Sequence, residues 1–354
     1  MESRTEKLRA LLEDGESALI TDDADRFYFT GFHSSAGVVF ITKHAAYFLI
    51  DFRYFEKAQK VVKAFNVILA TDVKRQIKEI ILHEKTEKVY VLTERISLAE
   101  FASFNKIFEG RLSDSDRLDK MITRLRQVKD SEEIAFIKHA QSFTDDTFNY
   151  ILEHIQAGRT EREVMLDMEF YMRKLGSEGV SFDFIVVSGK NSSLPHGVPT
   201  DKKIEAGDFV TMDFGAVYNG YRSDMTRTVA VEHVSDKQRS VYDTVLRAQM
   251  MALSEISPGK ICRDIDAVAR NYINNRGYEG CFGHGLGHSV GIEIHENPSF
   301  NTRCSAALVP GMVMTVEPGI YIENSFGVRI EDMAVVTEDG CDNITESDKS
   351  LIVL

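Results

Sequence analysis

The chain has 354 residues, of which 43% are hydrophobic and 27% are charged, and its formal net charge is −13. Such a chain is long for one hydrophobic core, so we expect two domains in an ordinary globular protein. The acidic balance disfavours nucleic acid and anionic membrane surfaces as partners, because neither gains from a negatively charged protein.

The cysteines and the start of the chain bear on the cellular compartment. Cys262, Cys281, Cys304 and Cys341 form no CxxC pair and no short disulfide framework, so we expect reduced thiols. No apolar signal core follows the charged residues 1–7, and no apolar run approaches the roughly 20 residues that span a bilayer. We therefore expect a cytoplasmic protein.

The first part of the chain alternates helical and strand patterns. Helical spacing covers residues 6–12, 54–63 and 73–83, and strand patterns cover residues 17–21, 37–41, 46–50, 66–70 and 88–92. Strands separated by helices predict an α/β domain. A polar and charged segment at 112–129 precedes a long helical pattern that begins at Ser131, which places the domain boundary near residue 120. We therefore expect an α/β domain at 1–120 and a second domain at 121–354.

The second domain contains an internal duplication. Helical patterns open after Gly158 and after Gly259, and similar apolar runs cover residues 207–215 and 311–319. The offset is 101 residues between the two glycines (158 to 259) and 104 residues between the two apolar runs (207 to 311). Two such halves facing each other would bring carboxylates of both halves towards a pseudo-twofold axis.

Five side chains in the second domain could share a cation: Asp213, Asp224, His288, Glu317 and Glu331. Asp213 and Glu317 lie inside apolar β-runs, where a buried carboxylate is costly unless a cation or hydrogen bonds compensate its charge. Residues 219–220 are Asn-Gly, a strong hairpin signal, and they separate the first two acids. A similar turn separates the last two. The pattern predicts metal-assisted chemistry.

A segment rich in glycine and histidine lies between the two acidic pairs. Residues 283–296 contain three of the ten histidines of the chain, His284, His288 and His295. The glycines allow close backbone approach and leave the imidazoles free to face a cavity. Apolar residues alternate over 290–294, which is typical of a buried strand.

These motifs resemble those of the pita-bread metallopeptidases, which include aminopeptidase P, prolidase and methionine aminopeptidase. Residues 284–296 match the motif of the aminopeptidase P and prolidase branch, and the likeness extends to 194–197, 213–228 and 315–331. The resemblance implies an α+β pita-bread catalytic domain with an internal pseudo-twofold duplication, preceded by a creatinase-like α/β domain. All five ligand positions match the family, which disfavours creatinase, a relative that lacks metal.

The resemblance also implies the roles of the ligand residues. Asp213 would bind one metal ion only, Asp224 and Glu331 would bridge both ions, and His288 and Glu317 would complete the second. This oxygen-rich set favours two Mn²⁺ ions, with Co²⁺ or Zn²⁺ as alternatives. Two such ions lower the pKa of a bound water and polarise the scissile carbonyl. Glu317 would carry a proton from that water to the leaving nitrogen.

Five further side chains are candidates for the same site. By the same resemblance, His196 and His295 would stabilise the oxyanion or the leaving amine. Arg329 lies two residues before the last acid, on the same strand face, and would orient that carboxylate or meet the substrate. Tyr221 and His284 are candidates for the substrate pocket.

The resulting hypothesis is a metallo-exopeptidase that hydrolyses the Xaa-Pro bond at the N-terminus of short peptides, an Xaa-Pro aminopeptidase. An Xaa-Pro dipeptidase (prolidase) is the alternative, because the motifs place the same residues in both enzymes. Methionine aminopeptidase is more remote, since it usually has no separate domain like residues 1–120. A non-catalytic peptide-binding protein of the same fold would not need five aligned ligands. We expect a homodimer that acts on short peptides with proline in the second position.

Overall fold

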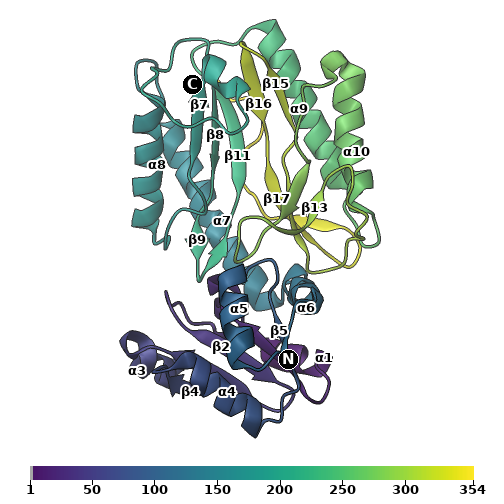
Figure 1. Cartoon of the computed structure of the whole chain (residues 1–354). Helices are drawn as coiled ribbons and strands as arrows, with labels where there is room; N and C mark the ends of the chain where they lie inside the picture. The colour runs from purple at the N-terminus through teal and green to yellow at the C-terminus, as the bar shows by residue number, and fades with distance from the viewer. Residues whose placement is uncertain (1–2) are drawn as a thin grey trace. The chain divides into compact units, whose positions relative to one another are not determined.

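The computed structural model describes residues 3–354, so the first two residues of the expected N-terminal domain lie outside the described part. The chain forms two compact units, Met1–Arg126 and Gln127–Leu354. Figure 1 draws the first unit in purple to blue and the second in teal to yellow. No helix formed by residues 3–354 combines the length and apolar character that crossing a membrane requires.

The first unit is built on one mixed sheet with the strand order β4-β3-β2-β1-β5-β6. Its strands are β1 (Glu16–Ile20), β2 (Val38–Thr42), β3 (Ala46–Ile50), β4 (Asn66–Leu69), β5 (Lys88–Val91) and β6 (Leu112–Ser113). The strands β1, β2 and β3 pair antiparallel, and the other pairs are parallel. Helices α1 (Arg4–Leu11), α3 (Phe52–Val61) and α4 (Val73–His83) agree with the sequence patterns.

Three helices of the first unit were not anticipated: α2 (Asp23–Thr30), α5 (Leu98–Ile107) and α6 (Arg117–Gln127). The helix α6 occupies the segment that the sequence analysis described only as polar and charged. Its apolar residues Leu118 and Ile122 are buried, and Asp119 accepts a 2.9 Å hydrogen bond from the Thr93 hydroxyl. The many charges of α6 hid this short apolar stripe.

The second unit contains two sheets and two small hairpins. The first half consists of α7 (Ser131–Leu152), α8 (Glu161–Leu175), β7 (Ile185–Ser188), the 3₁₀ turn η1 (Gly189–Ser193), β8 (Phe209–Phe214), β9 (Val217–Tyr218), β10 (Tyr221–Arg222) and β11 (Met225–Ala230). The second half consists of α9 (Asp236–Glu255), α10 (Cys262–Ile273), the π turn η2 (Asn274–Tyr278), β12 (Gly287–Ser289), β13 (Glu296–Phe300), β14 (Val313–Val316), β15 (Gly319–Ile322), β16 (Phe326–Arg329), β17 (Asp332–Val336) and β18 (Cys341–Asn343). The sheet orders are β11-β8-β7 and β13-β12-β14-β17-β18, and Figure 1 shows the strands between α8 and the pair α9 and α10.

The predicted duplication is confirmed by equivalent main-chain hydrogen bonds. In the first half the Gly158 N–H donates to the Ile204 carbonyl over 2.8 Å. In the second half the Gly259 N–H donates to the Leu308 carbonyl over 2.8 Å. In both halves, therefore, the turn that precedes the helix (α8 or α10) is held by an equivalent hydrogen bond to a later segment of the chain.

The hairpin predicted at Asn219 and Gly220 is confirmed. Both residues have positive φ, 45° and 74°, and they connect the antiparallel strands β9 and β10. Positive φ at both central residues is the requirement of a type I′ turn, which asparagine and glycine meet at low cost.

The strand predicted at 290–294 is wrong. These residues form bends between β12 and β13, although Val290 and Ile292 are buried as their alternation suggested. The Gly291 carbonyl accepts from the Arg222 N–H over 2.9 Å, and the Ile292 carbonyl accepts from Arg222 Nε over 2.9 Å. The segment is therefore enclosed over Val290, Gly291 and Ile292 without the alternation of a strand.

Candidate metal centre

A cavity of about 810 Å³ lies in the second unit, and all five predicted ligands line it. The cavity is also lined by four of the other candidates, His196, His284, His295 and Arg329. Tyr221 is not among its lining residues. The fold therefore gathers nine of ten predicted site residues around one space.

Two equivalent strand pairs place the four carboxylates. Asp213 in β8 lies opposite Thr226 in β11, and Asp224 directly precedes β11. In the second half, Glu317 directly follows β14 and Glu331 directly precedes β17, its antiparallel neighbour. The Glu331 N–H donates to the Thr226 carbonyl over 3.1 Å, which joins the two halves at the site.

Three of these side chains form a compact group suited to a metal ion. Asp224, His288 and Glu331 each offer a ligand atom, and these atoms lie within 4.8 Å of one another. His288 Nε2 lies 3.6 Å from Asp224 Oδ2 and 3.4 Å from Glu317 Oε1. The Asp213 Oδ1 and Glu331 Oε1 atoms are buried and have no hydrogen-bond partner within residues 3–354. Orphaned carboxylate oxygens beside a neutral imidazole fit a divalent cation.

The pKa values of the predicted ligands shift in the direction expected of titratable groups that are buried close together. Burial, followed by the charge of nearby carboxylates, raises the pKa of Asp224 and of Glu331 well above the ordinary range. Burial also raises the pKa of Glu317 to about 8. Burial lowers the pKa of His288 to about 4, so its imidazole is neutral and able to bind a cation. A bound cation would favour the charged form of all three carboxylates.

Arg329 is the cation that balances part of this charge. Its Nη2 donates to Asp213 Oδ2 over 2.7 Å, and its Nε donates to Thr226 Oγ1 over 3.0 Å. Thr226 in turn donates to Glu331 Oε2 over 2.7 Å. The strand face that Arg329 and Glu331 were expected to share is therefore wrong, and Arg329 reaches Glu331 only through the Thr226 hydroxyl. Arg329 ends β16 whereas Glu331 precedes β17 in another sheet, so the two do not alternate on one strand.

Sequence reasoning missed Tyr321, which connects two of the candidates. Its hydroxyl accepts from Arg329 Nη1 over 2.8 Å and lies 3.0 Å from His284 Nε2. Burial raises the pKa of Tyr321 to about 12, so the hydroxyl keeps its proton. Burial lowers the pKa of His284 to about 4. The sequence carries no local signal for this contact, because the residues come from different elements.

The two remaining histidines face the cavity from separate loops. His196 follows η1 and Pro195, and His295 directly precedes β13. The rings of His295 and His288 meet edge to face, with centroids 4.5 Å apart. Partial burial lowers the pKa of His295.

The structure places Tyr221 away from the predicted substrate pocket. Its side chain is buried, and its hydroxyl donates to Glu133 Oε1 of α7 over 2.7 Å. Its ring packs on Phe136, with centroids 5.7 Å apart. Tyr221 therefore packs β10 against α7, because its position in the hairpin turns it towards that helix.

The comparisons with known families decide which class of enzyme this geometry represents. Residues 135–338 match the model of metallopeptidase family M24, and residues 4–128 match the creatinase/prolidase N-terminal domain. The chain belongs to metallopeptidase family M24. The predicted pita-bread fold, the creatinase-like N-terminal domain and the metallopeptidase class are thereby confirmed.

Relatives of this M24 chain cover nearly its whole length. An Xaa-Pro dipeptidase of Pyrococcus furiosus is 34% identical over 361 residues, which cover 99% of this chain and 100% of the relative. The structure of an Xaa-Pro dipeptidase from Bacillus anthracis is 40% identical, with a TM-score of 0.95 and 99% coverage of both chains. The structure of an X-Pro aminopeptidase from Thermotoga maritima is 37% identical, with a TM-score of 0.90 and coverage of 96% and 97%.

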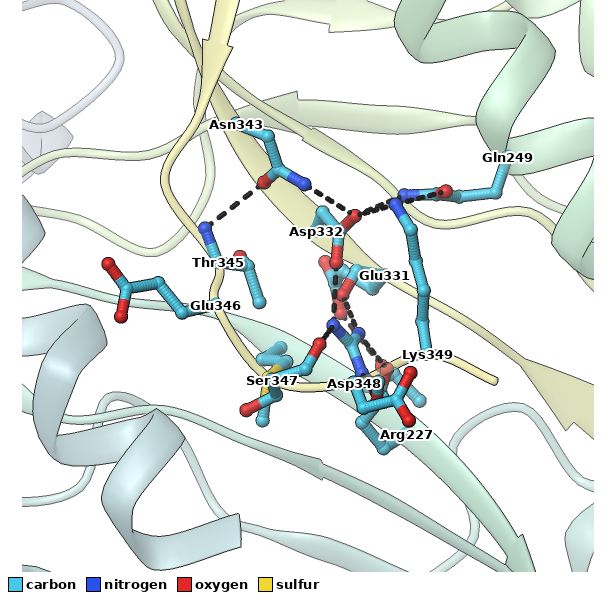
Figure 2. A network of polar contacts seen from close by, with 12 residues as sticks. Arg227, Gln249, Glu331, Asp332, Asn343, Thr345, Glu346, Ser347, Asp348 and Lys349 are labelled. Carbon is cyan, nitrogen blue, oxygen red and sulfur yellow. Dashed lines mark hydrogen bonds and ion pairs between the residues drawn. The ribbon is translucent and has the colours of Figure 1, made fainter. Parts of the chain in front are cut away.

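A buried polar network holds the main chain of Glu331 in the M24 domain (Figure 2). Arg227 donates to the Glu331 carbonyl and, over 2.7 Å, to Asp332 Oδ1. Asp332 also accepts hydrogen bonds from Gln249, Asn343 and Lys349. Burial alone would raise the pKa of Asp332, but the charges of Arg227 and Lys349 outweigh burial and lower it. An ionised Asp332 thus anchors the strand that begins directly after Glu331.

Proposed function

We propose that this M24 metallopeptidase is an Xaa-Pro aminopeptidase that removes the first residue from short peptides with proline in the second position. The observation that carries the proposal is that all five predicted ligands line one cavity. Within it, Asp213 and Glu331 each have a buried carboxylate oxygen without a hydrogen-bond partner among the described residues, and Asp224 and His288 lie close to Glu331. The names of the similar proteins, which are Xaa-Pro dipeptidases and an X-Pro aminopeptidase, support the choice of substrate class.

Five residues would hold two divalent ions, which we propose to be Mn²⁺, with Co²⁺ and Zn²⁺ as alternatives. Asp213 would serve one ion, Asp224 and Glu331 would serve both, and His288 and Glu317 would serve the other. When bound, such ions lower the pKa of a water molecule and polarise a carbonyl.

The chain's own residues supply the remaining chemistry. Glu317 faces the cavity, where it would accept a proton from the attacking water and pass it to the leaving nitrogen. His196 and His295 line the same cavity from its two loops and would donate hydrogen bonds to the oxyanion or to the leaving amine. The Tyr321 hydroxyl and Arg329 would keep the Asp213 carboxylate in a fixed orientation.

The preference for an aminopeptidase over a dipeptidase rests on the cations that line the cavity. A dipeptide places its proline carboxylate inside the site, where it needs a cationic partner. Arg329 was one candidate, but four of its N–H groups are used by Thr226, Pro195, Tyr321 and Asp213. Both ring nitrogens of His284, the other candidate, already have partners. Arg329 thus has one N–H group left and His284 has none, so neither offers the pair of donors that binds a carboxylate bidentately.

The dipeptidase alternative would need another cation, and Arg162 is the other guanidinium among the described lining residues. Arg162 is exposed and pairs with Asp201 over 2.9 Å. A side chain of this kind can reorient towards a substrate, so an Xaa-Pro dipeptidase is the second candidate function.

The test compares a tripeptide Xaa-Pro-Xaa with the matching Xaa-Pro dipeptide, using purified protein loaded with Mn²⁺. We expect kcat/KM for the tripeptide to be at least comparable to that for the dipeptide. Hydrolysis of the dipeptide alone would decide for prolidase. A matched Xaa-Ala-Xaa peptide controls for proline, and a Met-Ala peptide tests methionine aminopeptidase activity. Failure to cleave any of these peptides would favour the non-catalytic binding protein. The expected homodimer belongs to the same proposal and is tested by light scattering.

A further inference from the structure

We propose that Glu161 is a positioning residue that fixes the loop 188–200 and, through this loop, the imidazole of His196. The inference rests on the proposed function, in which His196 contacts the reacting peptide. Glu161 itself is the first residue of α8 and is not among the residues that line the cavity.

The Glu161 carboxylate is fully buried and is bound by one loop only. Its Oε1 accepts from the Ser188 N–H over 2.7 Å, from the Ser188 hydroxyl over 3.0 Å and from Asn191 Nδ2 over 3.0 Å. Its Oε2 accepts from the Thr200 N–H over 3.0 Å, from the Thr200 hydroxyl over 2.7 Å and from Asn191 Nδ2 over 3.2 Å. No ion pair joins Glu161 to a cation within residues 3–354. Hydrogen bonds alone therefore compensate its burial.

These contacts gather both ends of the loop at one carboxylate. Ser188 ends β7, Asn191 lies in η1, and Thr200 lies four residues after His196. Two other bonds tie the loop to β16, because the Ser192 hydroxyl accepts from the Gly327 N–H over 2.9 Å and the Pro195 carbonyl accepts from Arg329 over 3.2 Å. Glu161 thus fixes the base of a loop whose middle carries the cavity histidine.

The His196 imidazole depends on this anchoring because it has no anchor of its own. It is exposed, and no residue of the described chain shares a hydrogen bond with it. Its place in the cavity is therefore set by the main chain of the loop. A shift of about 1 Å in such a group can lower a rate by about a hundredfold.

The duplicated half shows that the fold itself does not require the carboxylate. The residues equivalent to Glu161 and Thr200 are Cys262 and Cys304, at the offsets of 101 (161 to 262) and 104 (200 to 304) residues. The N–H of the residue after Glu161 donates to the Thr200 carbonyl over 3.1 Å, and the equivalent bond to the Cys304 carbonyl measures 3.0 Å. The same main-chain closure thus forms with two cysteines. The carboxylate is particular to the half whose loop carries His196.

The test begins with Glu161→Gln, which replaces one acceptor oxygen by an amide that cannot accept from the loop. We expect unchanged bound metal, a kcat lowered by about tenfold to a hundredfold, and a KM within about twofold of the wild-type value. The decisive comparison adds Glu161→Gln to His196→Ala. If Glu161 acts through His196, the double variant has the kcat of His196→Ala alone. An equal further loss in the double variant would overturn the proposal.

Hydrogen exchange of loop 188–200 gives a second readout that needs no substrate. We expect Glu161→Gln to speed exchange in this loop, whereas the control Glu163→Gln, at an exposed capping residue two positions further along α8, leaves both exchange and kcat unchanged. Asn191→Ala removes one donor and should act in the same direction if Glu161→Gln does not fold. Wild-type exchange and kcat in the folded variants would refute the role of Glu161. A wild-type protein that cleaves no Xaa-Pro peptide refutes the proposed function instead, and loop exchange still decides on Glu161.

Discussion

Arg329 Nη2 lies 2.7 Å from Asp213 Oδ2, and this guanidinium is the one cationic side chain within residues 3–354 that contacts a carboxylate of the candidate metal centre directly. The strong local field of Tyr321, Asp213 and Glu317 outweighs burial and raises the pKa of Arg329 well above its ordinary range. One guanidinium against four ionised carboxylates leaves three negative charges uncompensated. Two divalent cations would supply four positive charges, enough to compensate all three, whereas one divalent cation would leave one negative charge uncompensated.

Replacing Arg329 by methionine should destabilise the metal-free protein. Removing one partner of a buried ion pair typically costs about 3 kcal/mol or more, because the other charge is left uncompensated. We expect this loss in denaturant unfolding at pH 8 in the presence of a chelator. Arg173→Met is the control, since its pair with Glu169 is exposed and should contribute less than about 1 kcal/mol. Equal stability of the two variants would contradict the assigned role of Arg329.

Replacing Asp224 by asparagine should abolish peptidase activity and lower the amount of bound metal. The reason is the proposed role of Asp224, which would serve both ions. The same change should raise the stability of the metal-free protein at pH 8, because it removes a buried charge that neighbouring carboxylates repel. Metal analysis and thermal unfolding check both effects. Two equivalents of metal with wild-type turnover would remove Asp224 from the site.

The stability of the metal-free protein should fall as the pH rises from about 6.5 to 8, above the range in which the lowered pKa values of His284 and His288 act in the opposite direction. Glu317 has an ordinary pKa of 4.5, and burial raises its pKa in the folded protein to about 8. Between these values the folded state holds a proton that the unfolded chain has lost, so the free energy of unfolding decreases with rising pH. The raised pKa values of Asp224 and Glu331 act in the same direction. Added Mn²⁺ should therefore raise Tm more at pH 8 than at pH 5, and a pH-independent effect would argue against these carboxylates as ligands.

His295→Ala should keep its metal and lose kcat by about a hundredfold to a thousandfold, the usual effect of removing one donor to a developing oxyanion. His295 lines the cavity but is not part of the compact group around His288. Steady-state kinetics with metal analysis of the same sample is the measurement. An unchanged kcat with a raised KM would assign His295 to substrate binding only.

Local patterns predicted most strands of the first unit and four of the acids that line the cavity, Asp213, Asp224, Glu317 and Glu331. Turn chemistry at Asn219 and Gly220 was sufficient to place Asp213 and Asp224 on neighbouring segments. The same patterns failed where burial arises without pairing, as in the bend at 290–294, or where charges hide a short apolar stripe, as in α6. Tyr221 was misplaced for a related reason, because the sequence does not report which neighbour a hairpin residue faces.

The sequence by itself determined the two-domain organisation, the duplication and the identity of the five candidate ligands. These features follow from spacing, apolar runs and turn residues, which act over short stretches of chain. Only the tertiary structure decided which groups support the site. Arg329 donates a hydrogen bond to Asp213, Thr226 donates one to Glu331, and Glu161 accepts hydrogen bonds from the loop that carries His196. Each of these contacts joins residues about 40 to 120 positions apart in the chain. Their formation depends on how sheets, helix and loop pack together, and no local pattern encodes that packing.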